Sequence, residues 1–478
     1  MTQDSLAHTT ALILAAGFGT RMKSQKPKVL HAICGKPLVY YPIKAALDAG
    51  CADVVVVVGH GRAEVEAYLA KAFGKYVRTA LQEQQHGTGD AARAGLSAVG
   101  AEAKRLLVFY GDVPLLLADD VARVALALDA SPKAVLAVAT CSLDDPSGYG
   151  RIVRSTGGSI IEIREQKDLR TDAERGICEI NPGIYAASVT FFKESLASLQ
   201  PNNAQGELYL TDIISFAAKK SLSVVGVDSR AEVLVGVNDR RQLIAAEETM
   251  FLRIAEAWRL AGVTVRSGAR IETGVTLGQD AIIETGVHLR GSTDVGKGAV
   301  VDVGCVLSNV RVGASTLIKP YSILTDSVVG ESAQIGPFSH VRPECTIGDE
   351  AHIGNFVETK KTSIGRGSKA NHLAYLGDGV IGAGANIGAG TIFCNYDGFL
   401  KHTTTIGDGA FIGSDSQLVA PVRVGKDAYV ATGTTVTKDI PDEALAIGRV
   451  PQENKLEYAS KLRARMKAAK EARKGKEG

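Results

Sequence analysis

The sequence lacks the features that would assign it to nucleic acid, to a membrane or to secretion. Its 478 residues carry a formal net charge of only +2, which provides no general electrostatic field for nucleic acid or for a membrane surface. Residues 1–10 do not have the basic start of a signal peptide, and the apolar run after them meets Gly17 too early to span a bilayer. We therefore expect a cytoplasmic protein that binds neither nucleic acid nor membranes.

Cysteine is scarce as well, and its spacing excludes the usual roles of clustered cysteines. The seven cysteines are scattered along the chain, form no C-x-x-C pair and are odd in number. The sequence therefore predicts reduced thiols and no disulfide framework.

Length and composition are typical of a globular protein with more than one domain. Hydrophobic residues make up 45% of the chain and charged residues 22%, so disorder is not indicated. The chain is too long for one ordinary core, and a sequence repeat begins just past its midpoint. We expect an α/β domain over residues 1–238, a helical linker over 239–262, a repeat domain over 263–455 and a basic tail over 456–478.

The strongest pattern in the chain is an aliphatic residue at every sixth position. A helix requires an apolar period of about 3.6 and a strand a period of about 2, so this longer period indicates a coil of short strands, with three hexads to a triangular turn. An all-β sandwich, the alternative, would alternate strictly and show hairpin turns. A glycine often follows the aliphatic residue, as in Ile335-Gly336, Ile347-Gly348, Ile406-Gly407 and Val424-Gly425, and we interpret it as easing the turn. The repeating positions, with slips of phase, are Ile271, Leu277, Ile283, Leu289, Val295, Val301, Leu307, Val312, Ile318, Leu324, Val329, Ile335, Val341, Ile347, Ile353, Ile406, Ile412, Leu418, Val424, Val430 and Val436.

The first half combines apolar runs with amphipathic stretches of helix length. The runs cover residues 11–16, 54–58, 106–110 and 135–138, which predicts an α/β fold with a mainly parallel sheet. Residues 239–261 carry one apolar helical face, and Gly262 is a suitable residue to end that helix. From Lys461 onward the tail has eight Lys or Arg against two Glu, which is typical of a solvated helix or coil.

The first apolar run leads into a glycine-rich turn with two cations. The segment reads L-A-A-G-F-G-T-R-M from Leu14 to Met22 and is followed by Pro27-Lys28. A dinucleotide-binding fingerprint would have a third glycine at Met22, and a Walker loop would have Gly-Lys-Ser/Thr, so neither fits. Glycines let backbone N–H groups close on a phosphate, while Arg21 and Lys28 can neutralise charge on a phosphorus under attack and on a departing pyrophosphate. The segment predicts nucleotidyl transfer, with Arg21 and Lys28 as catalytic residues.

A second acidic element follows the apolar run 106–110. Asp112 would stand at the carboxyl end of that strand, where ligands of open α/β sheets bind. A surface Asp that caps the next helix is the alternative for an isolated residue. Beside the first motif we favour Asp112 as a Mg²⁺ ligand, because carboxylate oxygens suit a cation that bridges phosphates.

The six-residue aliphatic period is interrupted in two segments, and both segments are rich in polar residues. We expect loops to leave the coil at residues 355–379 and 393–405, because departures from a repeat are where functional loops occur. The first segment contains His372 among several lysines. A lone histidine is more often a surface or structural residue. Acylation of an amine, however, needs a base near neutral pH and cations for a sugar phosphate, which His372, the lysines and Arg342 can supply.

These motifs resemble known families. The string L-x-x-G-x-G-T-R-M…P-K is similar to the signature of the sugar nucleotidyltransferases, and the hexads resemble the left-handed parallel β-helix of the hexapeptide acyltransferases. Taken together, the chain resembles the bacterial bifunctional N-acetylglucosamine-1-phosphate uridyltransferase/glucosamine-1-phosphate acetyltransferase family over almost its whole length. The resemblance implies acetyl transfer from acetyl-CoA to glucosamine-1-phosphate, then uridylyl transfer from UTP to form UDP-N-acetylglucosamine and pyrophosphate. It also implies Mg²⁺ and a homotrimer whose acetyltransferase site is shared between subunits.

The resemblance assigns roles to individual residues. It implies that His372 is the base for acetyl transfer and that Asn238 shares the metal with Asp112. UTP and the UDP-sugar would be bound by Leu14, Ala15, Ala16, Gly17, Lys28, Gln82, Gly87, Thr88, Gly150, Glu165, Asn181 and Asn238. Glucosamine-1-phosphate would be bound by Arg342, Lys360, Tyr375 and Asn386, and acetyl-CoA would be contacted by Ala389, Asn395, Tyr396, Ser414, Thr432 and Arg449.

Four positions depart from the family pattern, and two other functions stay open. Gln84 replaces an acidic residue, Pro182 a threonine, Asn371 a glycine that would favour positive φ, and Thr432 a small alanine. The chain could instead be a single-activity sugar nucleotidyltransferase whose β-helix only oligomerises or regulates. A non-catalytic scaffold is the third hypothesis, against which the intact Arg21, Lys28 and Asp112 speak.

Overall fold

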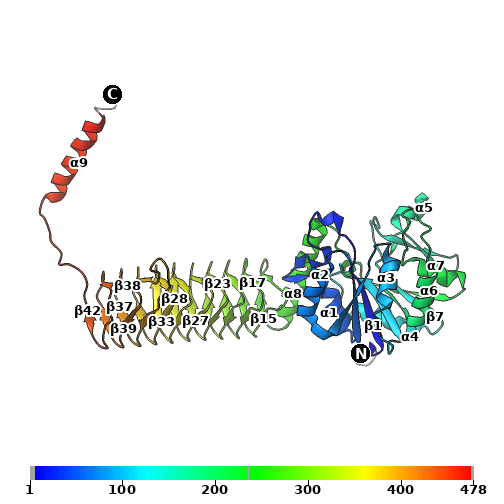
Figure 1. The fold of residues 1–478 in the computed structure, drawn as a ribbon, viewed down its shortest axis with the longest axis horizontal. Coiled ribbons are helices and arrows are strands. Elements are labelled where there is room, and N and C mark those ends of the chain that lie inside the picture. The colour runs from blue at the N-terminus through cyan, green and yellow to red at the C-terminus, as the bar shows by residue number, and fades with distance from the viewer. Residues whose placement is uncertain (1–5, 235, 475–478) are drawn as a thin grey trace. The chain divides into compact units, whose positions relative to one another are not determined.

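The computed structural model describes residues 6–234 and 236–474, and the chain divides into two compact units. The first unit comprises Met1–Ala257 with Ile271–Thr273, and the second comprises Trp258–Arg270 with Gly274–Gly478. Figure 1 follows the elements along the chain. The outermost residues of the predicted first domain and of the basic tail, 1–5 and 475–478, lie outside the described residues, as does position 235.

The first unit is built on one ten-stranded sheet of order β5-β4-β1-β6-β11-β7-β10-β8-β9, with β12 also pairing with β7. The strands β5, β4, β1 and β6 are parallel to one another, as predicted, whereas β11, β10, β8 and β9 continue the sheet by antiparallel pairing. The strands are β1 (Thr9–Leu14), β4 (Asp53–Val58), β5 (Val77–Leu81), β6 (Arg105–Tyr110), β7 (Ala134–Ser142), β8 (Gly150–Arg154), β9 (Ile160–Arg164), β10 (Glu179–Asn181), β11 (Tyr185–Ser188) and β12 (Ser223–Asp228), with a separate hairpin of β2 (Ala32–Ile33) and β3 (Lys36–Pro37).

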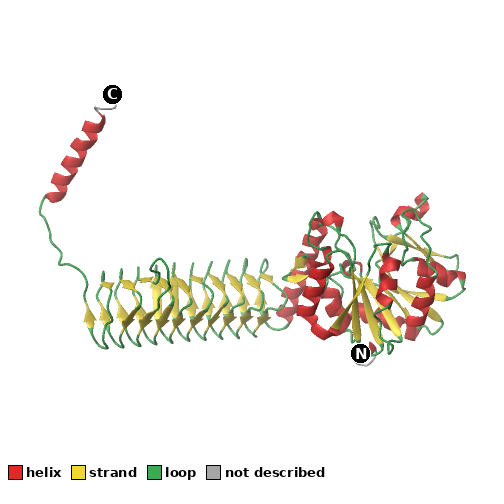
Figure 2. Ribbon diagram, viewed as in Figure 1, coloured by secondary structure: helices red, strands yellow, loops and turns green. Residues whose placement is uncertain are grey.

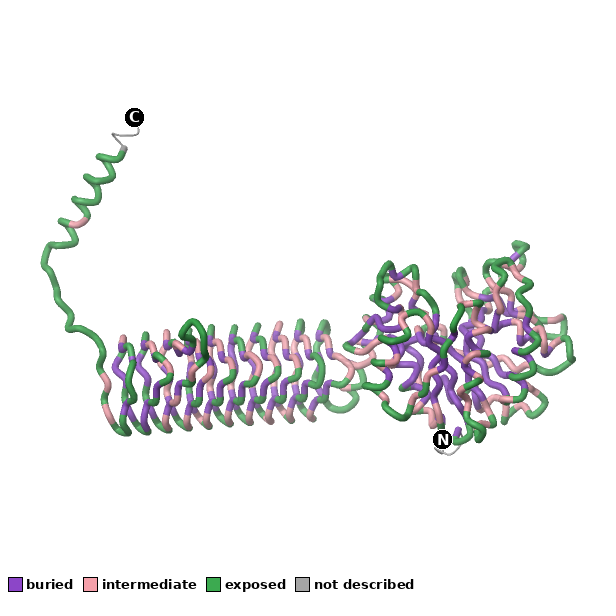
Figure 3. The backbone as a smooth tube through the Cα atoms, in the orientation of Figure 1, coloured by how far each residue is buried: buried purple, intermediate pink, exposed green. Residues whose placement is uncertain are grey.

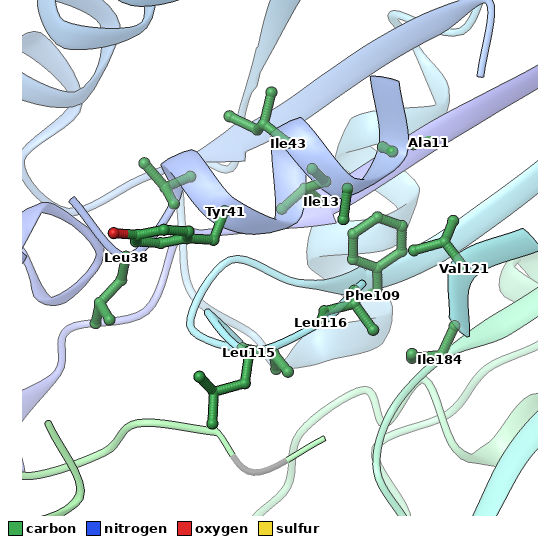
Figure 4. Close-up of a cluster of buried hydrophobic side chains, with 14 of the residues drawn as sticks. Ala11, Ile13, Leu38, Tyr41, Ile43, Phe109, Leu115, Leu116, Val121 and Ile184 are labelled. Carbon is green, nitrogen blue, oxygen red and sulfur yellow. The ribbon is translucent and has the colours of Figure 1, made fainter. Parts of the chain in front are cut away.

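Helices cover both faces of this sheet because its strands are apolar on both faces. On β1, Ala11 and Ile13 enter one buried cluster while Leu12 and Leu14 enter the other, since successive side chains of a strand point to opposite sides. Figure 4 shows part of the first cluster, with Ile13 and Phe109 close together. The helices are α1 (Tyr40–Asp48), α2 (Arg62–Phe73), α3 (Thr88–Leu96), α4 (Ala118–Ala130), α5 (Asp172–Arg175), α6 (Val189–Ala197), α7 (Asp212–Lys219) and α8 (Arg240–Leu260).

The predicted linker helix is α8. It ends just before Gly262, whose φ of 86° is the left-handed conformation that favours glycine. Leu243, Ala246 and Met250 are buried in the core of the first unit, so much of the helix packs there. The predicted boundaries of the functional domains stay a prediction.

The second unit is the predicted coil of short strands, which form three parallel sheets (Figure 2). The first sheet contains β13 (Thr264–Val265), β16 (Ile282–Ile283), β19 (Val300–Val301), β22 (Leu317–Ile318), β25 (Gln334–Ile335), β28 (His352–Asn355), β31 (Lys369–His372), β34 (Asn386–Ile387), β37 (Phe411–Ile412), β40 (Tyr429–Val430) and β42 (Leu445–Ala446). The second contains β14 (Arg270–Ile271), β17 (His288–Arg290), β20 (Val306–Ser308), β23 (Ile323–Thr325), β26 (His340–Val341), β29 (Glu358–Lys360), β32 (Tyr375–Gly377), β35 (Ile392–Cys394), β38 (Gln417–Val419) and β41 (Thr435–Val436). The third contains β15 (Thr276–Leu277), β18 (Asp294–Val295), β21 (Arg311–Val312), β24 (Ser327–Val329), β27 (Cys345–Ile347), β30 (Ser363–Ile364), β33 (Gly379–Ile381), β36 (Thr404–Ile406) and β39 (Val422–Val424).

The repeating aliphatic residues point inward, as predicted, and every one of them is buried. Figure 3 shows the resulting alternation of buried and exposed segments along the coil. A second buried position, which the sequence pattern did not reveal, lies four residues after the aliphatic one and holds a small residue such as Ala281, Thr316 or Ser368. The hydroxyls at this position donate to backbone carbonyls, for example Thr316 to Gly330 at 2.6 Å and Ser368 to Gly382 at 2.6 Å. The interior therefore tolerates polar residues such as Thr316 and Ser368 because their hydroxyls are hydrogen-bonded.

Of the four glycines named for this position, Gly336 has positive φ, 98°, as a turn role predicts, whereas Gly348, Gly407 and Gly425 have a different role. Gly348 does not have positive φ, and a Cβ on it would come within 2.8 Å of the backbone nitrogen of Arg366. A Cβ on Gly407 would come within 2.6 Å of the nitrogen of Lys426. These glycines are required by the close approach of the next coil, whereas the turns themselves use other residues with positive φ, such as Glu350 at 57°.

The predicted loop at residues 355–379 is wrong, because the coil continues through it. The inward position is occupied by Thr359, which pairs with Val341 and Leu376, and by Ala370, which pairs with Ile353 and Ile387. Neither Thr359 nor Ala370 is a large aliphatic residue, so the six-residue aliphatic period cannot be seen in the sequence there, although the strands of the coil continue. The second predicted departure is confirmed: residues 395–403 leave the coil between β35 and β36.

Two further predictions concern membranes and thiols. None of the helices within the described residues has the length and apolar character that a membrane crossing requires. All seven cysteines are free thiols, as predicted. The basic tail contains a helix, α9 (Tyr458–Lys474).

Candidate active sites

A cavity of about 530 Å³ lies in the first unit, beyond the carboxyl ends of β1 and β6. This is the position at which open α/β sheets bind ligands. Every residue that was predicted for nucleotidyl transfer lines it, namely Leu14, Ala15, Ala16, Gly17, Arg21, Lys28, Gln82, Gly87, Thr88, Asp112, Gly150, Glu165, Asn181 and Asn238. The structure therefore brings the whole predicted set together, while their individual roles stay predictions.

The glycine-rich turn forms one wall of the cavity. The space beside the Cα of Gly17 is open, so a ligand can approach the backbone there. Gly19 has φ 63°, and a Cβ on it would lie 2.5 Å from Cβ of Lys28. Two short 3₁₀ turns, Thr20–Met22 and Lys28–Leu30, then present Arg21 and Lys28. A side chain at Gly19 would thus displace Lys28, which is predicted to be catalytic.

Two cations and two oxygen ligands meet at this wall. The ammonium of Lys28 forms an ion pair with Asp112 Oδ2 and donates to Asn238 Oδ1 at 3.2 Å, while Arg21 Nη2 donates to the same amide oxygen at 2.9 Å. The side chains of Lys28 and Asp112 are only 15% and 16% exposed, so their attraction is weakly screened.

The same oxygens fit a divalent cation. The Lys28 ammonium already occupies a cationic position between Asp112 and Asn238, so both oxygens point to one place. Hard oxygen donors of this kind suit Mg²⁺. Within residues 6–234 and 236–474 no cluster of three or more His, Cys, Asp or Glu is arranged to hold a metal.

The predicted sugar end of the cavity combines three neighbouring strands. Gly150 of β8 pairs with Asn181 of β10, and Glu165 follows β9 directly. Asn181 is buried, and its amide donates to Tyr185 Oη at 2.6 Å and accepts from the backbone of Gly183 at 3.0 Å. Thr211 donates to Glu165 at 3.1 Å, but burial still raises the pKa of this carboxyl. Pro182, which replaces the expected threonine, also lines the cavity and offers no N–H.

The predicted uracil end is fixed by internal hydrogen bonds. Gln82 is buried, and its amide donates to the carbonyl of Gly87 at 3.1 Å and to Asp90 at 2.8 Å. Gly87 has φ 109° and precedes α3, whose first residue is Thr88. Gln84, which replaces an acidic residue, is not among the lining residues, and its side-chain oxygen lies 2.7 Å from Nε2 of His86.

Sequence reasoning missed several residues of this cavity. Phe18, Gln85, Tyr110 and Tyr149 also line it. Gln85 donates to the carbonyl of Ala16 at 3.0 Å, and this hydrogen bond connects it to the start of the glycine-rich turn. Gln85 and Tyr110 stand beside predicted motifs, but apolar or amide side chains give no signal of chemistry on their own.

In the second unit, His372 stands at the end of β31. Its Nδ1 lies 2.9 Å from Oδ1 of Asn355, which is opposite it in the parallel register. Because the amide oxygen accepts, Nδ1 carries the hydrogen and Nε2 keeps a free lone pair. Asn371 lies within the same strand without positive φ, so the expected reason for a glycine there is wrong; the positive φ falls on Leu373, at 49°.

The predicted ligands of glucosamine-1-phosphate lie on neighbouring coils. Arg342 forms an ion pair with Glu358 at 2.6 Å, and Glu358 is opposite Tyr375 in register. Lys360 closes β29, and Asn386 begins β34, next to Lys369 of β31. Lys360 and Tyr375 belong to the second sheet and Asn386 to the first, while Arg342 directly follows β26 of the second sheet. His372 and Tyr375 flank one corner between these two sheets.

Four of the predicted acetyl-CoA contacts, Ala389, Ser414, Thr432 and Arg449, follow one another along the coil. The backbone of Asp415 donates to the carbonyl of Ala389 at 2.7 Å, and that of Gly433 donates to the carbonyl of Ser414 at 2.9 Å. Arg449 donates to the carbonyl of Thr432. Residues that are 25, 18 and 17 positions apart in sequence (389 to 414, 414 to 432 and 432 to 449) thus follow one another, because each coil stacks on the next.

The loop over residues 395–403 presents Tyr396. Asn395 is buried and donates to Asp378, whereas Tyr396 is 56% exposed, with the ammonium of Lys401 4.6 Å from its ring centroid. His402 Nε2 lies 2.7 Å from Asp397, and this hydrogen bond, with two backbone donors, holds the pKa of Asp397 well below its usual range. An exposed loop stands out of the coil in Figure 3.

Sequence profiles match the two units in order. The profile of the MobA-like NTP transferase domain matches residues 11–175. The bacterial transferase hexapeptide profile, of six repeats, matches residues 326–361 and 403–438, and the hexapeptide repeat of succinyl-transferase matches residues 261–290. The α/β nucleotidyltransferase and left-handed β-helix folds are thereby confirmed.

Close relatives cover nearly the whole chain. A bifunctional protein GlmU of Sorangium cellulosum (strain So ce56) is 58% identical over 463 residues, which is 96% of this chain and 98% of that protein. Another, of Anaeromyxobacter sp. (strain Fw109-5), is 47% identical over 467 residues, covering 97% of this chain and 95% of that protein. A solved UDP-glucose pyrophosphorylase complexed with UDP-glucose is 20% identical with a TM-score of 0.42 and covers 51% of this chain and 99% of its own, a likeness too weak to carry an argument.

The partly buried carboxyl of Glu165 leads to a prediction about pH dependence. Because its pKa is raised in the folded protein, its contribution to stability is complete at low pH and is lost as the pH rises through that pKa. Glu165→Gln is neutral and can still accept from Thr211, so the variant should unfold at a higher temperature than the parent near neutral pH. The difference should vanish at pH values below the ordinary pKa of glutamate. Calorimetry at several pH values measures it, with the exposed Glu102→Gln as control; a difference independent of pH would contradict the assignment.

Proposed function

This chain belongs to the family of bifunctional GlmU proteins, and we propose that each of its two units carries one of the two reactions that make UDP-N-acetylglucosamine. The β-helix transfers acetyl from acetyl-CoA to the amine of glucosamine-1-phosphate. The α/β unit then joins N-acetylglucosamine-1-phosphate to the uridylyl group of UTP and releases pyrophosphate. The observation that supports this best is that two complete sets of motif residues lie in separate units, and that the first set lines one cavity.

Uridylyl transfer is a displacement at phosphorus. An oxygen of the sugar phosphate attacks the α-phosphorus of UTP, and the bond to the pyrophosphate oxygen breaks. Arg21 and Lys28 are positioned to stabilise the negative charge that moves onto the pyrophosphate. A divalent cation, which we propose to be Mg²⁺ held by Asp112 and Asn238, would neutralise phosphate charge when bound. Gln82, Gly87 and Thr88 would hold the uracil.

Acetyl transfer is a direct attack of an amine on a thioester. The amine nitrogen forms a bond to the acetyl carbon, the amine proton passes to Nε2 of His372, and CoA leaves as the thiolate. Asn355 fixes the histidine ring through Nδ1, which leaves Nε2 as the base. Arg342 and Lys360 would neutralise the sugar phosphate, with Tyr375 and Asn386 beside it. No covalent enzyme intermediate is needed, so Cys394 has no part in the step.

We also propose that the protein is a homotrimer in which the acetyltransferase site is shared between subunits. The loop 395–403 carries the exposed apolar residues Phe399, at 92%, and Leu400, next to the predicted acetyl-CoA contacts Asn395 and Tyr396. Large apolar side chains at the tip of a loop favour cover by a second copy of the chain. A cytoplasmic location stays a prediction.

Removing one carboxylate should separate the two activities. Asp112→Asn should lower uridylyl transfer by a factor on the order of 10², because the metal loses a charged ligand, and should leave acetyl transfer unchanged. Both activities are measured on the same preparation, with Asp129→Asn, an exposed ion-pair partner of Arg105, as control. Equal loss of both activities in a folded Asp112→Asn protein would refute the assignment.

Replacing the proposed base, His372, should have the converse effect. His372→Ala should lower acetyl transfer by a factor on the order of 10² or more and should not affect uridylyl transfer. His288→Ala, several coils away on β17, serves as control. Acetylation by His372→Ala at the parental rate across neutral pH would show that another group is the base.

Variants in the loop 395–403 test whether the acetyltransferase site is shared between subunits. Phe399→Asp combined with Leu400→Asp should shift the protein towards monomer in sedimentation, abolish acetyl transfer and spare uridylyl transfer. Tyr76→Asp, which changes an exposed aromatic residue of the first unit, is the matched control. A monomer with full acetyltransferase activity would disprove the shared site.

A further inference from the structure

The segment Gly148–Gly150 lines the sugar end of the nucleotidyl cavity, and its two ends are packed differently. Gly150 is buried and pairs with Asn181, and a Cβ on it would lie 2.8 Å from Ile163. Gly148 is exposed with φ 88°, and a Cβ on it would contact nothing within 4 Å. The Gly148 end is therefore loosely packed, and what holds it in place must come from other residues.

Arg151, the next residue, is the group that holds this segment. It is only 2% exposed and is the largest of the fully buried side chains among the described residues. One guanidinium nitrogen donates to the carbonyl of Tyr149, and the other donates to the side-chain oxygen of Gln166 at 2.8 Å. Burial of an arginine is costly, and here it lowers the pKa of the guanidinium.

Gln166 connects this guanidinium to the other side of the same segment. Its side-chain oxygen also accepts from the backbone N–H of Gly148 at 3.2 Å. Arg151 therefore restrains the segment at two points, directly at the carbonyl of Tyr149 and through Gln166 at the nitrogen of Gly148. Gln166 follows Glu165, so the network also ties the segment to a second residue of the sugar end.

The network does not have the character of a structural ion pair. Within the described residues no carboxylate lies at ion-pair distance from Arg151, and its Nε has no hydrogen-bond partner. On the same strand, Arg154 shows the ordinary arrangement, a surface pair with Glu179 at 2.7 and 2.8 Å. A buried cation whose hydrogen bonds go to a cavity-lining segment is positioned for that segment.

We propose that Arg151 and Gln166 act as a two-point clamp that positions Gly148–Gly150 against the amino sugar and so sets the affinity for N-acetylglucosamine-1-phosphate. Both are positioning residues, since neither lines the cavity. The proposal rests on the uridylyltransferase function proposed above. It predicts an effect on the sugar phosphate that is separate from UTP, because the residues of the uracil end lie elsewhere on the cavity wall.

The test is steady-state kinetics of uridylyl transfer by the full chain, with Mg²⁺, UTP and N-acetylglucosamine-1-phosphate. Arg151→Met and Gln166→Leu should each raise KM for the sugar phosphate by about tenfold or more, because a misplaced substrate contact weakens binding. KM for UTP and the acetyltransferase rate should stay at parental values. The double variant should be no worse than the more severe single variant, because both act on one network.

Two further variants separate a clamp from other roles. Arg151→Lys keeps the charge but cannot hold both oxygens in the planar geometry of a guanidinium, so its KM for the sugar phosphate should stay raised. A parental KM in Arg151→Lys would overturn the clamp and assign the effect to charge alone. Arg154→Met tests general disturbance of β8 and should leave both KM values unchanged; a rise equal to that of Arg151→Met would also overturn the proposal.

Gln166→Leu is the variant that is expected to fold normally, because Gln166 is exposed and its replacement leaves the buried guanidinium in place. It therefore separates an effect on the clamp from a loss of folding. Thermal unfolding of each variant accompanies the kinetics. A parental KM for the sugar phosphate in a stable Gln166→Leu protein would refute the clamp. Absence of uridylyl transfer in the parent would instead refute the proposed function, so the two failures are distinguishable.

Discussion

Both units depend on the register of parallel strands that are distant in sequence. In the first unit, Leu14 of β1 is opposite Tyr110 of β6, and this pairing sets the glycine-rich turn beside Asp112. In the second, Asn355 is opposite His372, and the pairing lets the amide orient the imidazole. A shift of either register by one residue would turn these side chains to the opposite face. Main-chain hydrogen bonds therefore position the predicted site residues of both units.

Close stacking makes that register rigid in the β-helix. The backbone of Gly348 donates to Ile364 at 2.7 Å, and a Cβ at this glycine would meet the next coil. No coil buries its inward side chains alone, so stability is a sum over neighbouring coils. The predicted acetyl-CoA contacts from Ala389 to Arg449 are aligned by this stacking, because equivalent positions of successive coils lie next to one another.

In the α/β unit, ion pairs and hydrogen bonds between charged and polar side chains fix the site, whereas in the β-helix the stacking of coils does so. Lys28, Arg21, Asp112 and Asn238 hold one another in a partly buried cluster. A preorganised group of this kind need not rearrange when negative charge develops on phosphate, which is where electrostatic catalysis gains most. At the other end of the cavity, desolvation raises the pKa of the partly buried Glu165, and behind the lining it lowers the pKa of the buried Arg151. Groups with shifted pKa values of this kind are typical of functional sites.

The sequence by itself determined whatever is written locally along the chain. The six-residue period predicted the coil and its inward residues, and the strings around Arg21 and His372 indicated the two chemistries, because these signals need only neighbouring positions. Only the tertiary structure decided what depends on neighbours in space. Thr359 and Ala370 keep the coil where the aliphatic period fails, since backbone pairing with the adjacent coils does not require a large side chain. Arg151 looked like an ordinary strand residue until folding buried its guanidinium beside Tyr149 and Gln166, because burial and hydrogen-bond partners are properties of the packed chain.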